Sequence, residues 1–202
     1  MRVKKILVWS QHVFFVAGFS ALAYCVLVVG AAKYYQARVR DQLSTSATAL
    51  AGRSEPPGLL RPVPTALRVG SGLALVGRLE VPRVQLSAMV AEGASSRVLR
   101  LAVGHVPGTA LPWQSGNVAL VAHRDTFFRR LGELKPGDMI RITVPGNQYT
   151  YRVTFSDIVK PEETWVLLPA TGETLTLVTC YPFHFVGPAP QRFVVRARLE
   201  AR

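Results

Sequence analysis

The chain has 202 residues, enough for one domain of ordinary size with an appendage. Its formal net charge is +12, carried by scattered arginines without a dense Lys/Arg block or an aromatic-basic RNA-binding pattern. These features argue against nucleic-acid binding and favour attraction to an anionic surface. The chain has 2 cysteines, and Cys25 lies in an apolar N-terminal run, so Cys180 has no partner for a disulfide-stabilised domain.

An uncharged apolar segment, 6–32, follows a short basic end, 1–5. Its most apolar part, 13–32, would span ~30 Å as a helix, about the thickness of one hydrocarbon core. A cleaved signal peptide has a shorter apolar region of roughly 7–15 residues. We therefore expect an uncleaved, single-pass membrane anchor with the basic end in the cytoplasm and the remaining chain outside. A cleaved signal sequence and a buried helix are the alternatives.

The next segment, 33–72, is polar and Ala-rich at first and then rich in Pro, Gly and Ser. No core-building period persists in it, so we interpret it as a stalk followed by a linker. The folded domain is expected over 73–202.

Strand signals dominate 73–202. Apolar or alternating runs bounded by turn residues predict strands at "ALVGRLEVP", "VQLSAMVAEG", "GNVALVAH", "KPGDMIRITV", "NQYTYRVTFSDIV", "ETLTLVTC" and "RFVVRARLE". The run "SSRVLRLAVG" predicts a short helix with a serine cap, and "DTFFRRLGEL" predicts a helical turn capped by Asp125. The expected fold is mainly β, a closed barrel of about eight strands with one or two short helices.

The phases of the last two strands place Cys180 and Arg192 outside the barrel. In "TLTLVTC" the leucines share the inward phase with Thr179, so Cys180 points outward. In the last strand Arg192 shares an outward phase with Arg196 and Arg198, which are expected to be ordinary solvent-exposed residues. If the two strands pair antiparallel, Cys180 ends one and Arg192 begins the next, which brings the thiol and the guanidinium together.

Cys180, Arg192 and His123 are candidate catalytic residues. A neighbouring cation favours the thiolate, which is the nucleophilic form of cysteine. Arginine also offers forked donors to an oxyanion. His123 ends the apolar strand "NVALVAH" at the barrel rim, where it could act as an acid and a base. The alternatives for Cys180 are an inert buried residue and an intermolecular cross-link.

Other polar residues offer competing interpretations. His105 is a second histidine near a strand end and the rival candidate for the acid-base residue, although a structural or supporting role is expected. Asp125 could orient the imidazole of His123, although the helix cap is the simpler interpretation. His184 follows Cys180 by four residues, but Pro182 rules out a shared helical face and therefore a metal pair.

Two adjacent acids, Glu162 and Glu163, could bind calcium, although adjacent loop acids are usually solvated. No cofactor and no metal are expected.

The segment "TLVTC", followed by an arginine that opens the last strand, resembles the sortases. The run "GNVALVAHRDTFFRRL" resembles their histidine segment, and the ending "CYPF…VGPAPQRFVV" is most similar to class D. The resemblance covers 75–199 and implies a sortase-type eight-stranded barrel. Two residues depart from the family pattern: Ala122 stands where many members have glycine, and Trp113 stands where a small residue is common.

The resemblance implies a cysteine transpeptidase. Cys180 would attack the Thr carbonyl at the Thr-Gly or Thr-Ala bond of an LPxT-type sorting signal at the C-terminus of secreted proteins, which gives a thioacyl-enzyme. An amine acceptor, such as a wall precursor or a pilus subunit, would then release the acyl group. His123 would transfer the protons and Arg192 would hold the oxyanion. Thr179 would help to bind the substrate, with an inward structural role as its alternative.

Other classes fit less well. The Ser-His-Gly-Cys pattern of L,D-transpeptidases is absent from the sequence, and papain-like proteases place cysteine before histidine. A membrane-tethered β-barrel that only binds a ligand is the alternative outside the enzymes.

Overall fold

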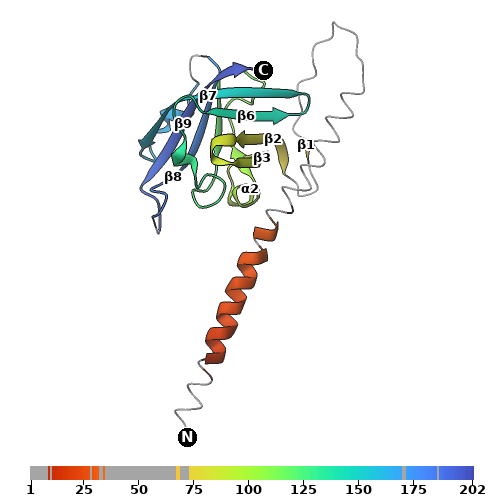
Figure 1. The fold of residues 1–202 in the computed structure, drawn as a ribbon, viewed down its shortest axis with the longest axis vertical. Coiled ribbons are helices and arrows are strands. Elements are labelled where there is room, and N and C mark those ends of the chain that lie inside the picture. Colours follow the sequence, from red (N-terminus) through yellow and green to blue (C-terminus); the bar gives the residue numbers. More distant parts are fainter. Residues whose placement is uncertain are drawn as a thin grey trace.

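The computed structural model describes residues 9, 11–27, 29–31, 34, 67–68, 73–169, 172–185 and 187–202. An N-terminal helix, Gln11–Ala31, has 21 residues and a mean hydropathy of 2.3, which is long and apolar enough to cross a membrane (Figure 1). The predicted basic end and nearly all of the predicted stalk and linker lie outside the described residues. The predicted domain boundaries therefore stay predictions.

The described strands form one sheet with short helical turns between them (Figure 1). The strands are β1 (Leu67–Arg68), β2 (Ala74–Val81), β3 (Leu86–Glu92), β4 (Val103–His105), β5 (Asn117–Val121), β6 (Met139–Val144), β7 (Asn147–Val159), β8 (Thr174–Tyr181) and β9 (Gln191–Ala201). The helices after residue 73 are η1 (Pro82–Val84), α2 (Ser96–Leu101), η2 (Leu131–Glu133) and η3 (Thr164–Leu167).

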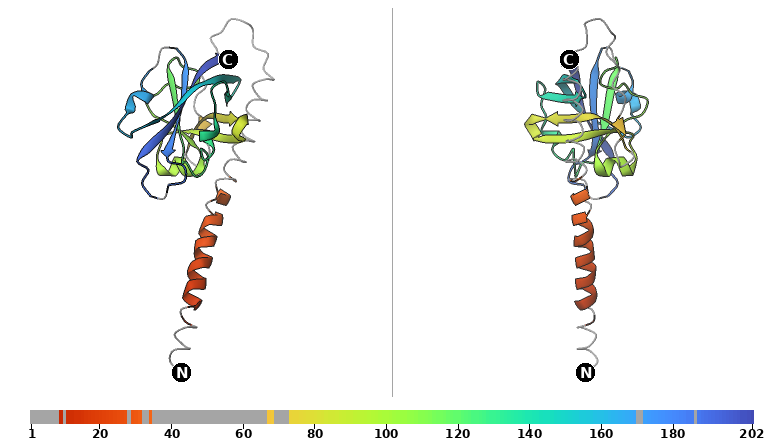
Figure 2. Two further views of the ribbon diagram at one scale, coloured as in Figure 1. Left: turned by 60° about the vertical axis from the view of Figure 1, so that its left-hand side comes forward. Right: turned by 90° about the vertical axis from the view of Figure 1, so that its right-hand side faces the viewer.

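The sheet closes into a barrel. Its strand order is β1-β2-β3-β4-β5-β8-β9-β7-β6, and β6 also pairs with β2. The strands β2 to β9 therefore form a ring of eight, and the short β1 extends it beside β2, within the range predicted as linker (Figures 1 and 2). The prediction of a closed, eight-stranded barrel is confirmed.

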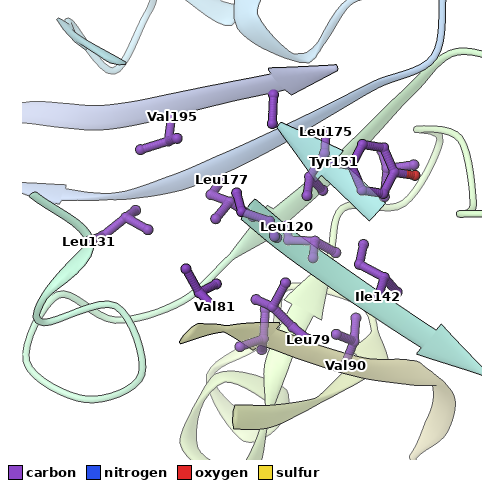
Figure 3. Packing of buried hydrophobic residues seen from close by; sticks show 14 of the residues in the cluster. Leu79, Val81, Val90, Leu120, Leu131, Ile142, Tyr151, Leu175, Leu177 and Val195 are labelled. Carbon is purple, nitrogen blue, oxygen red and sulfur yellow. The ribbon is translucent and has the colours of Figure 1, made fainter. Parts of the chain in front are cut away.

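The inward-facing side chains of the strands fill the barrel interior. Figure 3 shows Leu79, Leu120, Tyr151 and Leu177 converging from four different strands, and each is at most 1% exposed. Burial of one such side chain contributes about 1.5–3 kcal/mol. Closure also needs a close backbone contact, because a Cβ at Gly77 would lie 2.5 Å from a carbonyl oxygen on β6.

The short helices only partly follow the sequence pattern. Ser95 caps α2 as predicted, since its hydroxyl accepts from the amide of Val98 at 3.4 Å. The helical turn predicted within 125–134 is present as η2, but the cap predicted at Asp125 is wrong. Hydrogen-bonded turns run over 124–130 instead, and η2 then begins after Arg130 without a side-chain cap. The backbone turns immediately after His123, whose carbonyl accepts from the amide of Phe128 at 3.2 Å.

Candidate active site

Cys180 and Arg192 are directly opposed residues of one antiparallel hairpin. β8 pairs with β9 over its whole length, and the pair Cys180–Arg192 lies next to the last pair of the ladder. Both side chains are half-buried and lie on the outward face of the sheet. Directly opposed residues of an antiparallel pair have Cβ atoms ~4.5–5.5 Å apart. The predicted hairpin register is confirmed.

His123 lies on the other side of Cys180. β5 runs parallel to β8 with Val121 opposite Val178. Beyond the ladder, the amide of Ala122 donates to the carbonyl of Val178 at 3.3 Å. If the pairing of Val121 with Val178 is continued by two residues on each strand, His123 lies beside Cys180 at a strand spacing of ~4.8 Å. β8 thus lies between β5 and β9, and the structure brings His123, Cys180 and Arg192 to the same rim of the barrel.

Thr179 reinforces this register from inside the barrel. Its hydroxyl donates to the carbonyl of Ala122 at 2.8 Å, and the residue is only 3% exposed. The hydroxyl therefore couples β8 to the residue just before His123. A contact with substrate stays a prediction, and it would have to use the backbone of Thr179.

The guanidinium of Arg192 is oriented by nearby carbonyl groups. Its Nη1 donates to the carbonyl oxygens of Ala189 at 3.2 Å and Gln191 at 2.9 Å. Within the described part of the chain, its Nε and Nη2 have no hydrogen-bond partner. An arginine has five N–H donors, so this one keeps donors for an oxygen atom beside Cys180.

The loop between β7 and β8, described at 160–169 and 172–173, packs its η3 turn on the outward face of the same hairpin. Val166 of η3 is buried against Val159 and Val194, with Val178 alongside. The loop therefore builds a wall on the outward face next to Cys180.

Arg196 helps to hold this wall, contrary to the expectation that it is an ordinary exposed residue. Its Nη2 donates to the carbonyl of Val166 at 2.7 Å, and its guanidinium lies 5.7 Å from the ring centroid of Trp165. Partial burial lowers the pKa of Arg196 from its ordinary value. Arg198, two residues further on, is exposed as predicted.

Asn117 was not identified from the sequence, although it connects three segments. Its Oδ1 accepts from the hydroxyls of Thr174 at 3.1 Å and Thr176 at 2.7 Å, and its Nδ2 donates to the carbonyls of Val166 at 2.9 Å and Leu168 at 3.3 Å. The residue is 2% exposed. The available signal was an asparagine at the start of an apolar strand together with threonines in the outward phase of another.

His105 is held in the interior instead of at the rim. It is 2% exposed, and its Nδ1 lies 2.7 Å from a carboxylate oxygen of Glu92. Its Nε2 lies 3.0 Å from the carbonyl of Ala110 and 3.1 Å from the hydroxyl of Thr109. β5 separates β4 from β8, so the structure does not bring His105 to Cys180.

Among the described residues, no hydrogen bond joins the other polar candidates to Cys180. Asp125 is exposed in the turn after His123. Glu163 accepts from the amide of Lys160 at 2.6 Å. Across the described ranges, no three His, Cys, Asp or Glu residues gather in a way that could hold a metal ion. The absence of a cofactor stays a prediction.

An open pocket of about 560 Å³ lies at the rim, between the loop after β5 and the loop after β8. Aromatic residues form much of its wall, and charged residues of the β5–β6 loop form another part. Its lining includes Tyr181, Phe183, Phe193, Arg129, Glu133 and His184.

Trp113, one of the two departures from the family pattern, is partly buried against the barrel core. Its indole N–H is buried and has no hydrogen-bond partner in the described structure. Ala122, the other departure, is 5% exposed and fits in the extended register between Val121 and His123.

The sequence match to known proteins agrees with this geometry. The sortase domain profile matches residues 79–200, and the chain belongs to the sortase family. Sortase D of Bacillus subtilis (strain 168) is 38% identical over 120 residues, which cover 59% of this chain and 61% of that protein. The likeness to class D is therefore confirmed. The chain spans less than two thirds of that relative's length.

Solved structures agree on the fold. A Clostridium perfringens sortase D5 transpeptidase superposes with a TM-score of 0.62 at 21% identity, over 85% of this chain and 99% of the other. Sortase E1 from Streptomyces coelicolor, solved with a tripeptide in its active site, gives a TM-score of 0.57 at 28% identity, over 62% of this chain and 87% of the other.

Proposed function

We propose that this chain is a cysteine transpeptidase that cleaves an LPxT-type sorting signal after Thr and transfers the acyl group to an amine. The observation that carries the proposal is the placement of Cys180 on β8 between His123, after β5, and Arg192 on β9. A nucleophile with an acid-base group on one side and an oriented cation on the other suits acyl transfer. The tripeptide in the active site of the Streptomyces coelicolor relative supports a peptide substrate.

The first half-reaction forms a thioester. The Cys180 thiolate attacks the carbonyl carbon of the Thr residue, and the carbonyl electrons move onto the oxygen. The free donors of Arg192 would stabilise that oxyanion. The imidazolium of His123 then gives its proton to the leaving nitrogen as the C–N bond breaks. The products are an acyl-Cys180 thioester and the free amine of the released peptide.

The second half-reaction reverses the roles. An incoming amine attacks the thioester carbonyl, neutral His123 accepts the amine proton, and the C–S bond breaks to restore the thiolate. The net change exchanges one amine for another on the same carbonyl, so no oxidant or cofactor is needed. We propose a wall precursor or a pilus subunit as the source of the acceptor amine.

The N-terminal helix supports a membrane location. Gln11–Ala31 is a single helix of sufficient length and hydropathy to span a bilayer. We propose that it anchors the chain in the cell membrane with the barrel outside, where a secreted protein and a wall precursor would both be encountered.

The test uses the full chain in detergent, an internally quenched LPxT-type peptide and an excess of a small amine. We expect both cleaved peptide and amine-ligated product, and we expect prior treatment with iodoacetamide to remove both. A library of LPxT-type peptides that yields no product would contradict the proposal. An untreated chain that cleaves no peptide, yet binds it equally well before and after Cys180 is alkylated, would be a binding module.

A further inference from the structure

An arginine next to the candidate acid-base residue holds the loop that follows the candidate nucleophile. Arg124 comes directly after His123. Its Nη1 donates to the carbonyl of Pro182 at 3.0 Å, and its Nη2 donates to the carbonyls of Phe185 at 2.6 Å and Gly187 at 3.0 Å. One side chain thus connects three carbonyl groups of the β8–β9 loop, described at 182–185 and 187–190, to the backbone that carries His123.

The chemistry of Arg124 suits this contact. Hydrogen bonds from a charged donor are roughly twice as strong as neutral ones. The guanidinium also lies 5.9 Å from the ring centroid of Phe185, within the range of a cation–π contact. Two different nitrogens of a planar fork donate to these carbonyl oxygens, which the single nitrogen of a lysine cannot reproduce.

The same loop ends at Arg192. The carbonyls of Ala189 and Gln191, which orient the Arg192 guanidinium, come directly after the stretch that Arg124 holds. Arg124 therefore holds carbonyl groups of the β8–β9 loop as far as Gly187. The carbonyl of Ala189, near the end of the loop, and that of Gln191, the first residue of β9, orient Arg192. The loop joins the two strands that carry Cys180 and Arg192, so its shape sets the direction of the guanidinium beside the thiol.

We propose that Arg124 is a positioning residue for acyl transfer and acts through Arg192. By fixing the β8–β9 loop, it keeps the carbonyl groups that aim the Arg192 guanidinium in place. It also holds the backbone after His123 against the strand end that carries Cys180. Arg124 itself does not touch the reacting atoms. The inference rests on the proposed function, because it assigns a role within that site.

The first test is a double-mutant cycle in the full chain, read as kcat and KM on an LPxT-type peptide. Arg124→Ala should lower kcat about 10- to 100-fold and leave KM within about twofold, since a misplacement of ~1 Å in a site can cost ~10²-fold. Arg124→Lys should recover part of the loss. In an Arg192→Lys background, Arg124→Ala should cost less than about threefold, because the fork that it helps to aim is already gone.

The matched control is Arg152→Ala. Arg152 is also an arginine that donates to a backbone carbonyl, that of Gly137 at 3.1 Å, and it pairs with Glu200. It lies on β7 away from the rim, and its loss should leave kcat within about threefold. Any of three outcomes would overturn the inference. The losses of kcat could multiply in the double variant, Arg124→Ala could change KM alone, or Arg124→Ala could behave like Arg152→Ala. If Arg124→Ala does not fold, Arg124→Lys takes its place in the cycle.

A readout without substrate separates this inference from the proposed function. Amide hydrogen exchange should rise in the β8–β9 loop of Arg124→Ala and stay unchanged in the β7–β8 loop. Unchanged exchange in the β8–β9 loop would overturn the inference even if the enzyme turns over. A wild-type chain that cleaves no peptide would contradict the proposed function, and the exchange data would still show whether Arg124 holds the loop.

Discussion

Two histidines near the ends of adjacent strands have opposite surroundings. His105, at the end of β4, is 2% exposed and has polar partners at both ring nitrogens. His123, just after β5, is half-buried, and within the described residues its ring has no hydrogen-bond partner. A ring whose nitrogens are all used inside the fold cannot exchange a proton with a substrate unless those bonds break. The interior site thus serves the fold, and the rim site is open to chemistry.

A similar contrast holds between two other polar residues. Asn117, buried between β5, β8 and the β7–β8 loop, uses both ends of its amide in the fold. At the rim, Arg192 keeps donors that no described residue occupies. Asn117, with both ends of its amide bonded, stabilises the barrel, whereas the free donors of Arg192 lie at the rim, where a substrate can reach them.

The largest effect is expected at the nucleophile. Cys180→Ala should abolish both cleavage and transfer while the thermal unfolding temperature stays within a few degrees, because a half-buried thiol contributes little packing. Cys25→Ala, in the N-terminal helix, should keep full turnover in detergent. If Cys180→Ala cleaves the peptide at a rate near that of the wild type, Cys180 is not the nucleophile.

The histidines allow the contrast to be tested directly. His123→Ala should lower kcat ~10²–10⁴-fold, the usual contribution of general acid-base catalysis, with little change in stability. His105→Ala should instead lower the free energy of unfolding by about 1–3 kcal/mol, because it removes the buried partner of Glu92 and Ala110. Peptide kinetics and urea unfolding measure the two effects. Equal losses of kcat in both variants, with folding intact by circular dichroism, would contradict the assignment of His123 as the acid-base residue and His105 as a structural residue.

Arg192 comes next. Arg192→Ala should lower kcat ~10²–10³-fold, as expected for one oxyanion donor, and Arg192→Lys should recover only part because it loses the fork. Arg198→Ala is the control on the same strand, and its exposed side chain should change kcat less than about threefold. Arg196 is no suitable control, because it holds the carbonyl of Val166. If Arg192→Ala has the same kcat as Arg198→Ala, the Arg192 guanidinium takes no part in catalysis.

The smallest effect on rate is expected at Asn117. Asn117→Ala leaves two buried hydroxyls and a carbonyl of the β7–β8 loop without a partner, at about 1–3 kcal/mol for each unsatisfied group. We expect a clear loss of unfolding free energy in urea, with kcat within about tenfold of wild type in the folded fraction. A variant as stable as the wild type would show that this buried cluster does not stabilise the fold.

Much of the barrel and of the candidate site could be predicted because strand phase is a local signal. Alternation in β8 and β9 fixes which side chains point outward, and the hairpin then determines that Cys180 faces Arg192. His123 was predicted at the rim for the same reason, as it ends an apolar run.

Contacts between distant loops could not be predicted from local patterns. β4 has only 3 residues, too few to show a period. Arg124 reaches carbonyl groups more than fifty residues away, and Arg196 is half-buried only because η3 folds over it. The cap expected at Asp125 failed because the backbone after His123 forms successive turns instead of a helix.

The most direct test of the central claim, that the rim site forms an acyl-enzyme at Cys180, is intact-protein mass spectrometry. The full chain is mixed with an LPxT-type peptide, without an added amine, and quenched in acid. The account predicts a mass increase equal to the peptide up to its Thr residue, located on the proteolytic fragment that contains Cys180 and absent from Cys180→Ala. An adduct on another residue, or peptide cleavage in Cys180→Ala, would contradict it.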